Sequence, residues 1–301
     1  MSRQCLSTVP VVMACSVIAI LTGYAKSVGS HPADTESAVL VGAGDIADCR
    51  DLRGAEATAK LLEPIPGTVM AVGDLAYPDG SKENFKCYDK TWGRVKSRTR
   101  PAPGNHEFHA AGAKPYFEYF GTAAGEKRKG YYSYELGAWH IVVLNSECAD
   151  VGGCKAGSRQ EKWLRADLAA HPTACTLAYW HKPLFSSGSA HGNDGSVKAL
   201  WQALYDANAE VVVTGHDHDY ERFAPQNADG AADPERGIRE FVVGTGGKNQ
   251  RPFGAIDANS EARNANAFGV LKLTLRPDGY DWQFIPEAGK TFVDSGSAKC
   301  H

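Results

Sequence analysis

Short apolar runs alternate with stretches of helical periodicity over most of the chain after residue 38. A short apolar run between turn-forming residues is typical of a buried strand, whereas apolar positions three and four apart over a longer stretch indicate a helix. This pattern predicts strands at Ala38–Ala43, Thr68–Val72, Ile141–Asn145, Thr176–Trp180 and Glu210–Thr214, and helices at Gly54–Glu63, Arg159–Ala170 and Val197–Ala207.

The last part of the chain is strand-rich instead, with further strands predicted at Arg239–Val243, Gly269–Leu275 and Tyr280–Ile285. The tetrapeptide Arg276-Pro277-Asp278-Gly279 between the last two is a typical hairpin turn. Alternating strands and helices followed by consecutive strands favour an α/β fold of stacked sheets with helices outside. We expect one domain over residues 38–301.

The N-terminus resembles a processing signal. Residues 1–25 contain Arg3, an apolar run from Val9 to Leu21 and small residues around Ala25. This arrangement is typical of a secretory signal peptide, followed here by a polar linker at 26–37. It predicts a secreted or cell-envelope (periplasmic) protein without a stable membrane anchor after cleavage. A retained anchor is the alternative. A lipoprotein signal at Cys15 is disfavoured because the apolar run continues beyond that residue.

Charge and cysteine content narrow the function classes. A net charge of −3 leaves no basic excess for a dedicated nucleic-acid binder. Two of the eight cysteines fall in the predicted signal, and the remaining even number in an exported chain indicates disulfides. No C-x-x-C spacing supports a cysteine zinc site. Sequence alone does not assign the pairing, but proximity favours Cys148–Cys154, and elimination leaves Cys49–Cys87 and Cys175–Cys300.

Polar residues follow the predicted strands at the points where they end. The carboxyl ends of parallel strands share one edge of a sheet, where ligands bind in α/β proteins. Oxygen and imidazole donors without thiolates suit iron, zinc or manganese, and a carboxylate can bridge two such ions about 3.5–4 Å apart. The candidate ligands are Asp45, Asp74, Tyr77, Asn105, His181, His216 and His218.

The order of these motifs resembles that of the calcineurin-like metallophosphoesterases. The matching blocks are GDIA (44–47), GDLAY (73–77), GNHE (104–107), the histidine of YWHKP (179–183) and GHDHDYER (215–222). Most of that superfamily has a histidine where this chain has Ala47, and Tyr77 in the second block is typical of the purple acid phosphatase branch. The resemblance implies a four-layer α/β/β/α sandwich of two mixed sheets flanked by helices, here as the catalytic domain alone.

The resemblance also implies roles for the candidate ligands. Asp45, Tyr77 and His218 would hold a first metal, Fe(III), since a phenolate is a hard anionic donor. Asn105, His181 and His216 would hold Fe(II), Zn(II) or Mn(II), and Asp74 would bridge the two ions. A metal-bound hydroxide would then attack a phosphate monoester in line, with small phosphorylated compounds as substrates.

Other histidines are candidates for binding phosphate or protonating the leaving group. His106 directly follows Asn105, and His191 lies in the Gly/Ser loop after His181. His109 is a weaker candidate, and which histidine is the general acid stays open. Glu107 is expected to orient a neighbouring ligand, whereas His140 and His171 are expected to be structural.

Three alternatives remain beside the monoesterase hypothesis. A phosphodiesterase or nucleotidase would use the same metal site. A non-catalytic metal- or phosphate-binding protein would retain the ligands without turnover. The segment 41–47 also matches the dinucleotide fingerprint G-x-G-x-x-A after a strand. That match is disfavoured because Asp45 would repel a pyrophosphate.

Overall fold

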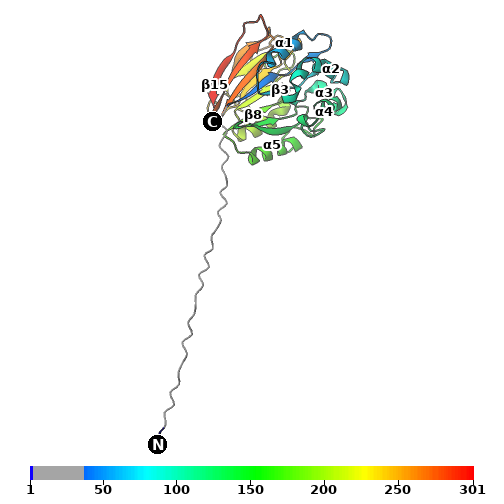
Figure 1. Cartoon of the computed structure of the whole chain (residues 1–301). Helices are drawn as coiled ribbons and strands as arrows, with labels where there is room; N and C mark the ends of the chain where they lie inside the picture. Colours follow the sequence, from blue (N-terminus) through cyan, green and yellow to red (C-terminus); the bar gives the residue numbers. More distant parts are fainter. Residues whose placement is uncertain (3–36) are drawn as a thin grey trace. The chain divides into compact units, whose positions relative to one another are not determined.

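Two large mixed β-sheets lie face to face at the centre of the protein (Figure 1). The computed structural model describes residues 1–2 and 37–301, so the predicted signal peptide and linker fall outside the described residues apart from their ends. The described residues 37–301 belong to one compact unit. None of the helices in the described part of the chain has the length and apolar composition needed to span a bilayer.

The first sheet has six strands in the order β15-β14-β13-β1-β3-β5. Its β1, β3 and β5 strands are parallel, whereas β13 to β15 run antiparallel and add the C-terminal part of the chain beside β1. The strands are β1 (Ala38–Ala43), β3 (Thr68–Val72), β5 (Thr99–Ala102), β13 (Gly269–Arg276), β14 (Gly279–Pro286) and β15 (Ser295–Lys299).

The second sheet has seven strands in the order β12-β10-β11-β9-β8-β7-β6, with β7, β8, β9 and β11 parallel at its centre. A separate two-stranded ladder joins β2 (Ala47–Asp48) to β4 (Ala76–Tyr77). The large-sheet strands are β6 (Tyr132–Leu136), β7 (Trp139–Val143), β8 (Cys175–Tyr179), β9 (Val211–Thr214), β10 (Tyr220–Phe223), β11 (Arg239–Val243) and β12 (Ser260–Asn264).

Helices cover the outer faces of the two sheets, and α1 and α5 lie on opposite sides of the sandwich (Figure 1). The α-helices are α1 (Arg53–Leu62), α2 (Lys82–Lys90), α3 (Asn105–Phe108), α4 (Lys114–Phe120), α5 (Arg159–Ala170) and α6 (Lys198–Asp206). Short 3₁₀ turns are η1 (Trp92–Arg98), η2 (Ala111–Ala113), η3 (Gly121–Ala124) and η4 (Gly195–Val197).

Side-chain alternation along the central strands separates two hydrophobic cores. On β9, Val211 and Val213 belong to the core between the sheets, whereas Val212 packs with Leu200 and Leu204 of α6 in a second core. Successive strand residues point to opposite faces, so a strand of continuous valines fills both layers at once. The predicted four-layer α/β/β/α sandwich is confirmed.

The element predictions hold best where strands are buried on both faces. The predicted β1, β3 and α5 ranges match the structure, and the Pro277-Asp278 hairpin joins β13 and β14 with Arg276 paired to Gly279. The strand predicted at 141–145 is two residues too late, because β7 begins at Trp139 opposite Leu136 of β6. Several partly exposed elements were not predicted: α2, α4, β6, β12 and β15. The short, largely buried β10 was also not predicted.

Three disulfides form with the pairing expected from proximity and elimination. Cys148–Cys154 closes a short loop. Cys49–Cys87 joins the loop after β2 to α2, and Cys175–Cys300 ties the C-terminus to β8.

His140 forms a buried ion-pair cluster away from the strand ends that carry the candidate ligands. Its fully buried ring lies between Glu135, 2.7 Å from Nδ1, and Asp167, 2.8 Å from Nε2. The ring of His171 stacks on it with centroids 4.7 Å apart. Burial lowers the pKa of His140, but the two carboxylates outweigh this and raise it above the ordinary value. Both nitrogens are occupied, which supports the structural role expected for this histidine.

We expect His140→Gln to lower the free energy of unfolding by about 2 kcal/mol, the size of a hydrogen bond to a charged group. A raised folded-state pKa adds stability that is fully present below the ordinary value of 6.5 and is lost as pH rises through the raised value. The deficit of the variant should therefore be larger at mildly acidic pH than at alkaline pH. Urea denaturation at both pH values measures it, with exposed His109→Gln as control. An equal deficit at both would contradict the charged state.

Candidate metal centre

The carboxyl ends of four parallel strands meet at one edge of the two sheets. Asp45 follows β1, Asp74 follows β3, His181 follows β8 and His216 follows β9. The β2–β4 ladder pairs Ala47 with Ala76 and so fixes the segment that presents Tyr77 beside Asp45.

The first group of donor atoms surrounds the hydroxyl of Tyr77. This hydroxyl donates to Asp45 Oδ1 at 2.7 Å and lies 3.1 Å from Asp74 Oδ2. It is also 3.2 Å from His218 Nε2, which in turn lies 3.4 Å from Asp45 Oδ1. All four side chains are at least 97% buried. The arrangement gathers three oxygens and one imidazole nitrogen around one small space.

The second group lies on the other side of Asp74. His181 Nε2 is 3.1 Å from the same Asp74 Oδ2 and 3.1 Å from His216 Nδ1. These three residues each offer a ligand atom, all within 4.8 Å of one another. Asn105 opens α3 next to them, and its Oδ1 is buried without a hydrogen-bond partner among the described residues. One carboxylate oxygen therefore adjoins both groups.

The backbone at this edge is strained where the donors are held. Asp45, Asp74 and His216 have positive φ angles of 59°, 51° and 72°, which side-chain-bearing residues rarely adopt. Close approach also needs glycine. A Cβ on Gly104 would lie 2.3 Å from Asp74 Oδ1, and one on Gly215 would lie 2.7 Å from Asp45 Oδ2. These two glycines, which precede donor residues in the sequence, are therefore needed because a side chain there would collide with a donor atom.

The pKa shifts at the site indicate that its buried carboxylates favour a positive charge beside them. Burial lowers the pKa of His181, but Asp74 and Asp45 outweigh it and raise the value to about 10. Burial and the charge of His181 lower the pKa of His216 to about 2. Burial and the two aspartates also raise the pKa of Tyr77 well above its usual value. In the metal-free protein, a protonated imidazole therefore occupies a place suited to a cation, and Tyr77 keeps its proton.

Backbone carbonyls orient two of the histidines. Nδ1 of His181 lies 3.0 Å from the carbonyl of Val72, and Nδ1 of His218 lies 2.7 Å from that of Asn249. Such contacts fix the ring so that Nε2 faces a metal position.

Glu107 orients the loops that carry the ligands, which is the kind of role expected for it from the sequence. Its fully buried carboxylate accepts the backbone N–H groups of Asp74 at 3.0 Å, Leu75 at 2.9 Å and Ala76 at 3.2 Å. It also accepts that of Gly104 at 2.8 Å, so it ties the second and third motif blocks together.

The remaining candidate histidines stand at the rim. His106 Nε2 is 3.7 Å from Asp74 Oδ2, and its Nδ1 contacts the carbonyl of Pro78. The ring of His109 is next to that of His106, with centroids 4.8 Å apart, and so lies farther out. His191 stacks on His216 with centroids 4.0 Å apart.

The sequence did not point to the residues that position His191. Asp217 accepts the N–H of His191 at 3.2 Å, and Glu221 accepts the N–H of Ser187 at 2.7 Å in the same loop. Arg251 Nη1 lies 2.6 Å from His191 Nε2, although the two residues are 60 positions apart. Burial and this guanidinium lower the pKa of His191, against the charge of Asp217. One sequence feature could have indicated a polar contact here: acidic residues stand at the alternate positions Asp217, Asp219 and Glu221.

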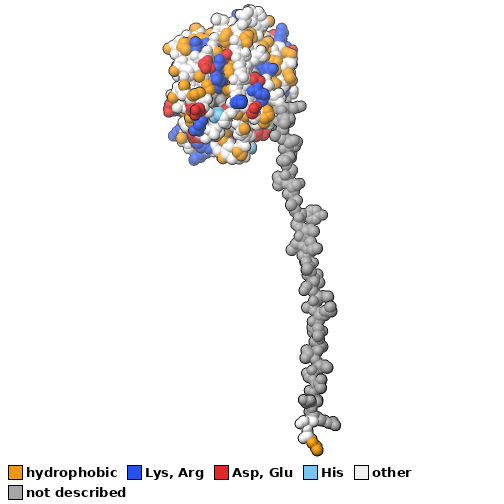
Figure 2. All heavy atoms as spheres, turned by 90° about the vertical axis from the view of Figure 1, so that its left-hand side faces the viewer, with side chains coloured by type: hydrophobic (Ala, Val, Ile, Leu, Met, Phe, Trp, Pro, Cys, Tyr) orange, Lys and Arg blue, Asp and Glu red, His pale blue; other side chains and the backbone are white. Residues whose placement is uncertain are grey.

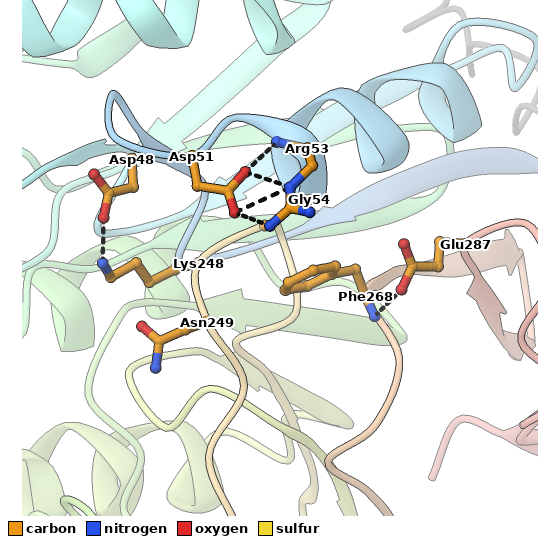
Figure 3. Close-up of a pocket in the computed structure, with 9 residues that line it drawn as sticks. Asp48, Asp51, Arg53, Gly54, Lys248, Asn249, Phe268 and Glu287 are labelled. Atoms are coloured by element: carbon orange, nitrogen blue, oxygen red, sulfur yellow. Dashed lines mark hydrogen bonds and ion pairs between the residues drawn. The ribbon is translucent and has the colours of Figure 1, made fainter.

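A cavity of about 530 Å³ adjoins the centre behind Lys248 (Figure 3). Nζ of Lys248 is 4.9 Å from the ring centroid of Tyr77 and pairs with Asp48, so Lys248 forms the wall between the cavity and the centre. Arg53 and Asp51 form a second ion pair at the cavity, next to Asp48 (Figure 3). Both cationic side chains that line this cavity thus form ion pairs with aspartates.

Known proteins of one class match this chain in sequence and in fold. A profile of the calcineurin-like phosphoesterase family matches residues 34–220, and the chain belongs to this family. Purple acid phosphatase 15 of Arabidopsis thaliana is 27% identical over 199 residues, covering 54% of this chain and 37% of the relative. Purple acid phosphatase 22 of the same plant is 28% identical over 230 residues, covering 66% and 49%.

Solved structures agree on the fold. A purple acid phosphatase from yellow lupin (Lupinus luteus) seeds superposes with a TM-score of 0.74 at 18% identity, covering 89% of this chain and 54% of the other. GAP50, described as the anchor in the inner membrane complex of Plasmodium, gives 0.68 at 13% identity, covering 88% and 89%. The chain spans less than half the length of the two Arabidopsis relatives. The resemblance to the purple acid phosphatase-like branch, inferred from the motifs, is confirmed.

The residues present fit a pair of metal ions. Crowded carboxylate, phenol and imidazole atoms, together with the orphaned Asn105 Oδ1, form a donor set without thiolates, which suits iron, zinc or manganese. Buried carboxylates and polar groups without partners are costly, and bound cations relieve that cost.

We expect Glu107→Gln to weaken metal binding by about 10- to 100-fold, the usual effect of removing a group that orients ligands. The amide turns an N–H₂ donor toward backbone N–H groups that need an acceptor. Metal titration followed by calorimetry measures the change. Half-exposed Glu118→Gln is the matched control and should bind like the wild type. Unchanged affinity in Glu107→Gln would show that the carboxylate does not position the ligands.

Proposed function

We propose that the protein is a dinuclear-metal phosphoesterase that hydrolyses phosphate monoesters. The observation that carries this proposal is the position of Asp74 Oδ2, which lies 3.1 Å from Tyr77 Oη in one donor group and 3.1 Å from His181 Nε2 in the other. A single oxygen shared by two donor groups is what a bridging carboxylate requires. Family membership and similarity to purple acid phosphatases support the same activity.

The two donor groups define the proposed ligand sets. Asp45, Tyr77 and His218 hold one ion, Asn105, His181 and His216 hold the other, and Asp74 is common to both. The pKa of the Tyr77 phenol is raised, so a strongly charged ion is needed to displace its proton. This requirement favours Fe(III) at the first position. The softer set with two imidazoles and an amide suits Fe(II), Zn(II) or Mn(II).

Bound metal ions supply a water-derived nucleophile near neutral pH and stabilise charge that develops on phosphoryl oxygens. The chain contributes the surroundings. Gly104 and Gly215 let the backbone approach the centre, and Glu107 holds the loops together. His106 and His191 stand at the rim on either side of the centre, where they can bind the phosphate and supply a proton to the leaving group.

Export is part of the proposal. Three disulfides within residues 49–300 suit an oxidising compartment. Together with the signal-like residues 1–25, they favour a secreted or cell-envelope enzyme that acts on small phosphorylated compounds.

Hydrolysis of p-nitrophenyl phosphate and bis-p-nitrophenyl phosphate tests the activity across acid to alkaline pH. We expect a higher kcat/KM for the monoester. Asp74→Asn should lower turnover at least about 10³-fold and reduce the metal content, since it removes a charged ligand from both positions. Asp281→Asn, on the exposed β14 surface, is the control. A preference for the diester would assign a phosphodiesterase, and no turnover with both metals bound would point to a binding protein.

Tyr77→Phe tests the first metal position by colour. We expect the iron-loaded wild type to absorb visible light through tyrosinate-to-Fe(III) charge transfer, and the variant to lose that band while keeping its far-UV circular dichroism. Phe lacks only the hydroxyl, so packing is preserved. Tyr88→Phe, another fully buried tyrosine, is the matched control. An unchanged band in Tyr77→Phe refutes the tyrosinate assignment.

A further inference from the structure

A cavity of about 520 Å³ opens between the loop after β11 and the end of β12. It differs in chemistry from the cavity behind Lys248. No carboxylate lines it, whereas three carboxylates line the other. Its polar and aromatic lining comes from Gln250, Arg251, Phe253, Arg263, Asn264 and Asn266.

The two arginines of this cavity form no direct ion pair among residues 37–301. Within the described part of the chain, neither Arg251 nor Arg263 has a carboxylate oxygen within 4.0 Å of its guanidinium. Arg263 donates only to the carbonyl and hydroxyl of Ser260. The nearby Glu221 is already satisfied by Ser187 and Ser260. Gln250 adds a buried Nε2 donor without a partner among residues 37–301.

Arg251 connects this cavity to the metal centre. Its Nη1 lies 2.6 Å from His191 Nε2, and the His191 ring stacks on His216 with centroids 4.0 Å apart. Its backbone N–H also donates to the carbonyl of His218 at 3.2 Å. Arg251 thus lies beside His191 and lines the cavity together with Arg263.

We propose that this cavity binds a second anionic group, a carboxylate or a further phosphate, on the leaving-group side of the substrate. Arginine presents planar paired donors that match the oxygens of both groups. Amides from Asn264 and Asn266 add neutral donors at the same lining. The inference rests on the proposed phosphoesterase function and assigns its substrate class: phosphate monoesters whose alcohol carries another negative charge.

Matched substrates isolate the second charge. The carboxylate pair is 3-phosphoglycerate against sn-glycerol 3-phosphate, and the phosphate pair is propane-1,3-diol bisphosphate against its monophosphate. We expect wild-type kcat/KM to favour the member with the second anionic group in at least one pair, and the pair with the larger ratio identifies that group. Arg263→Gln should lower that ratio about tenfold, as for loss of a charge-assisted hydrogen bond.

Arg276→Gln is the control for long-range charge, because Arg276 lies in the β13–β14 hairpin and pairs with Asp281. Its ratio should equal the wild-type ratio. Circular dichroism and thermal melting verify that all variants fold. Equal ratios in wild type and Arg263→Gln, with both esters hydrolysed, overturn the inference and leave the phosphoesterase proposal intact. An equal loss in Arg276→Gln also overturns it, because the effect is then one of overall charge.

A binding experiment decides the case in which the wild type hydrolyses neither ester and the proposed function fails. Calorimetry then compares the affinities of 3-phosphoglycerate and sn-glycerol 3-phosphate, and of the bisphosphate and the monophosphate. Tighter binding of the member with the second anionic group, lost in Arg263→Gln, supports the subsite as a binding site. Equal affinities within both pairs overturn it.

Discussion

The burial of two carboxylates, Asp45 and Asp74, at the meeting edge of the sheets is the constraint on which the site depends. A buried charge is costly unless it is paired and hydrogen-bonded. Backbone N–H groups of His216 and His106 donate to them at 2.8 Å, and the hydroxyl of Tyr77 lies between them. These contacts stabilise the negative charge without neutralising it. The protein thereby keeps a well-defined place for cations.

This constraint explains why the site is built from turns rather than from regular elements. A carboxylate that follows a strand can point into the shared edge only if the chain turns at once, and Asp45 and Asp74 do so with positive φ. Two rigid sheets hold the turns on both sides, since β1 and β3 belong to one and β8 and β9 to the other. Strain is tolerated where the surrounding structure fixes it.

Much of this could be predicted because the signals are local. A strand buried on both faces gives a continuous apolar run, and the residue after it lies at the sheet edge, so Asp45, Asp74, His181 and His216 could be expected to converge. Elements with partly exposed faces give no such signal: α2 has the sequence KENFKCYDK and β12 has SEARN. The contact between Arg251 and His191 joins two loops through tertiary structure alone, and no local spacing encodes it.

The position of β1 has a consequence for the order in which the molecule can be assembled. β1 sits in the middle of its sheet, between β3, which follows it closely, and β13, which comes near the end of the chain. During synthesis β1 leaves the ribosome soon before β3 but long before β13, and long-range pairing of this kind is slow. Asp45 follows that strand after Gly44, so the strand that carries it gains its second neighbour only when β13 docks. The C-terminal residues thus take part in completing a site from which they are distant in sequence.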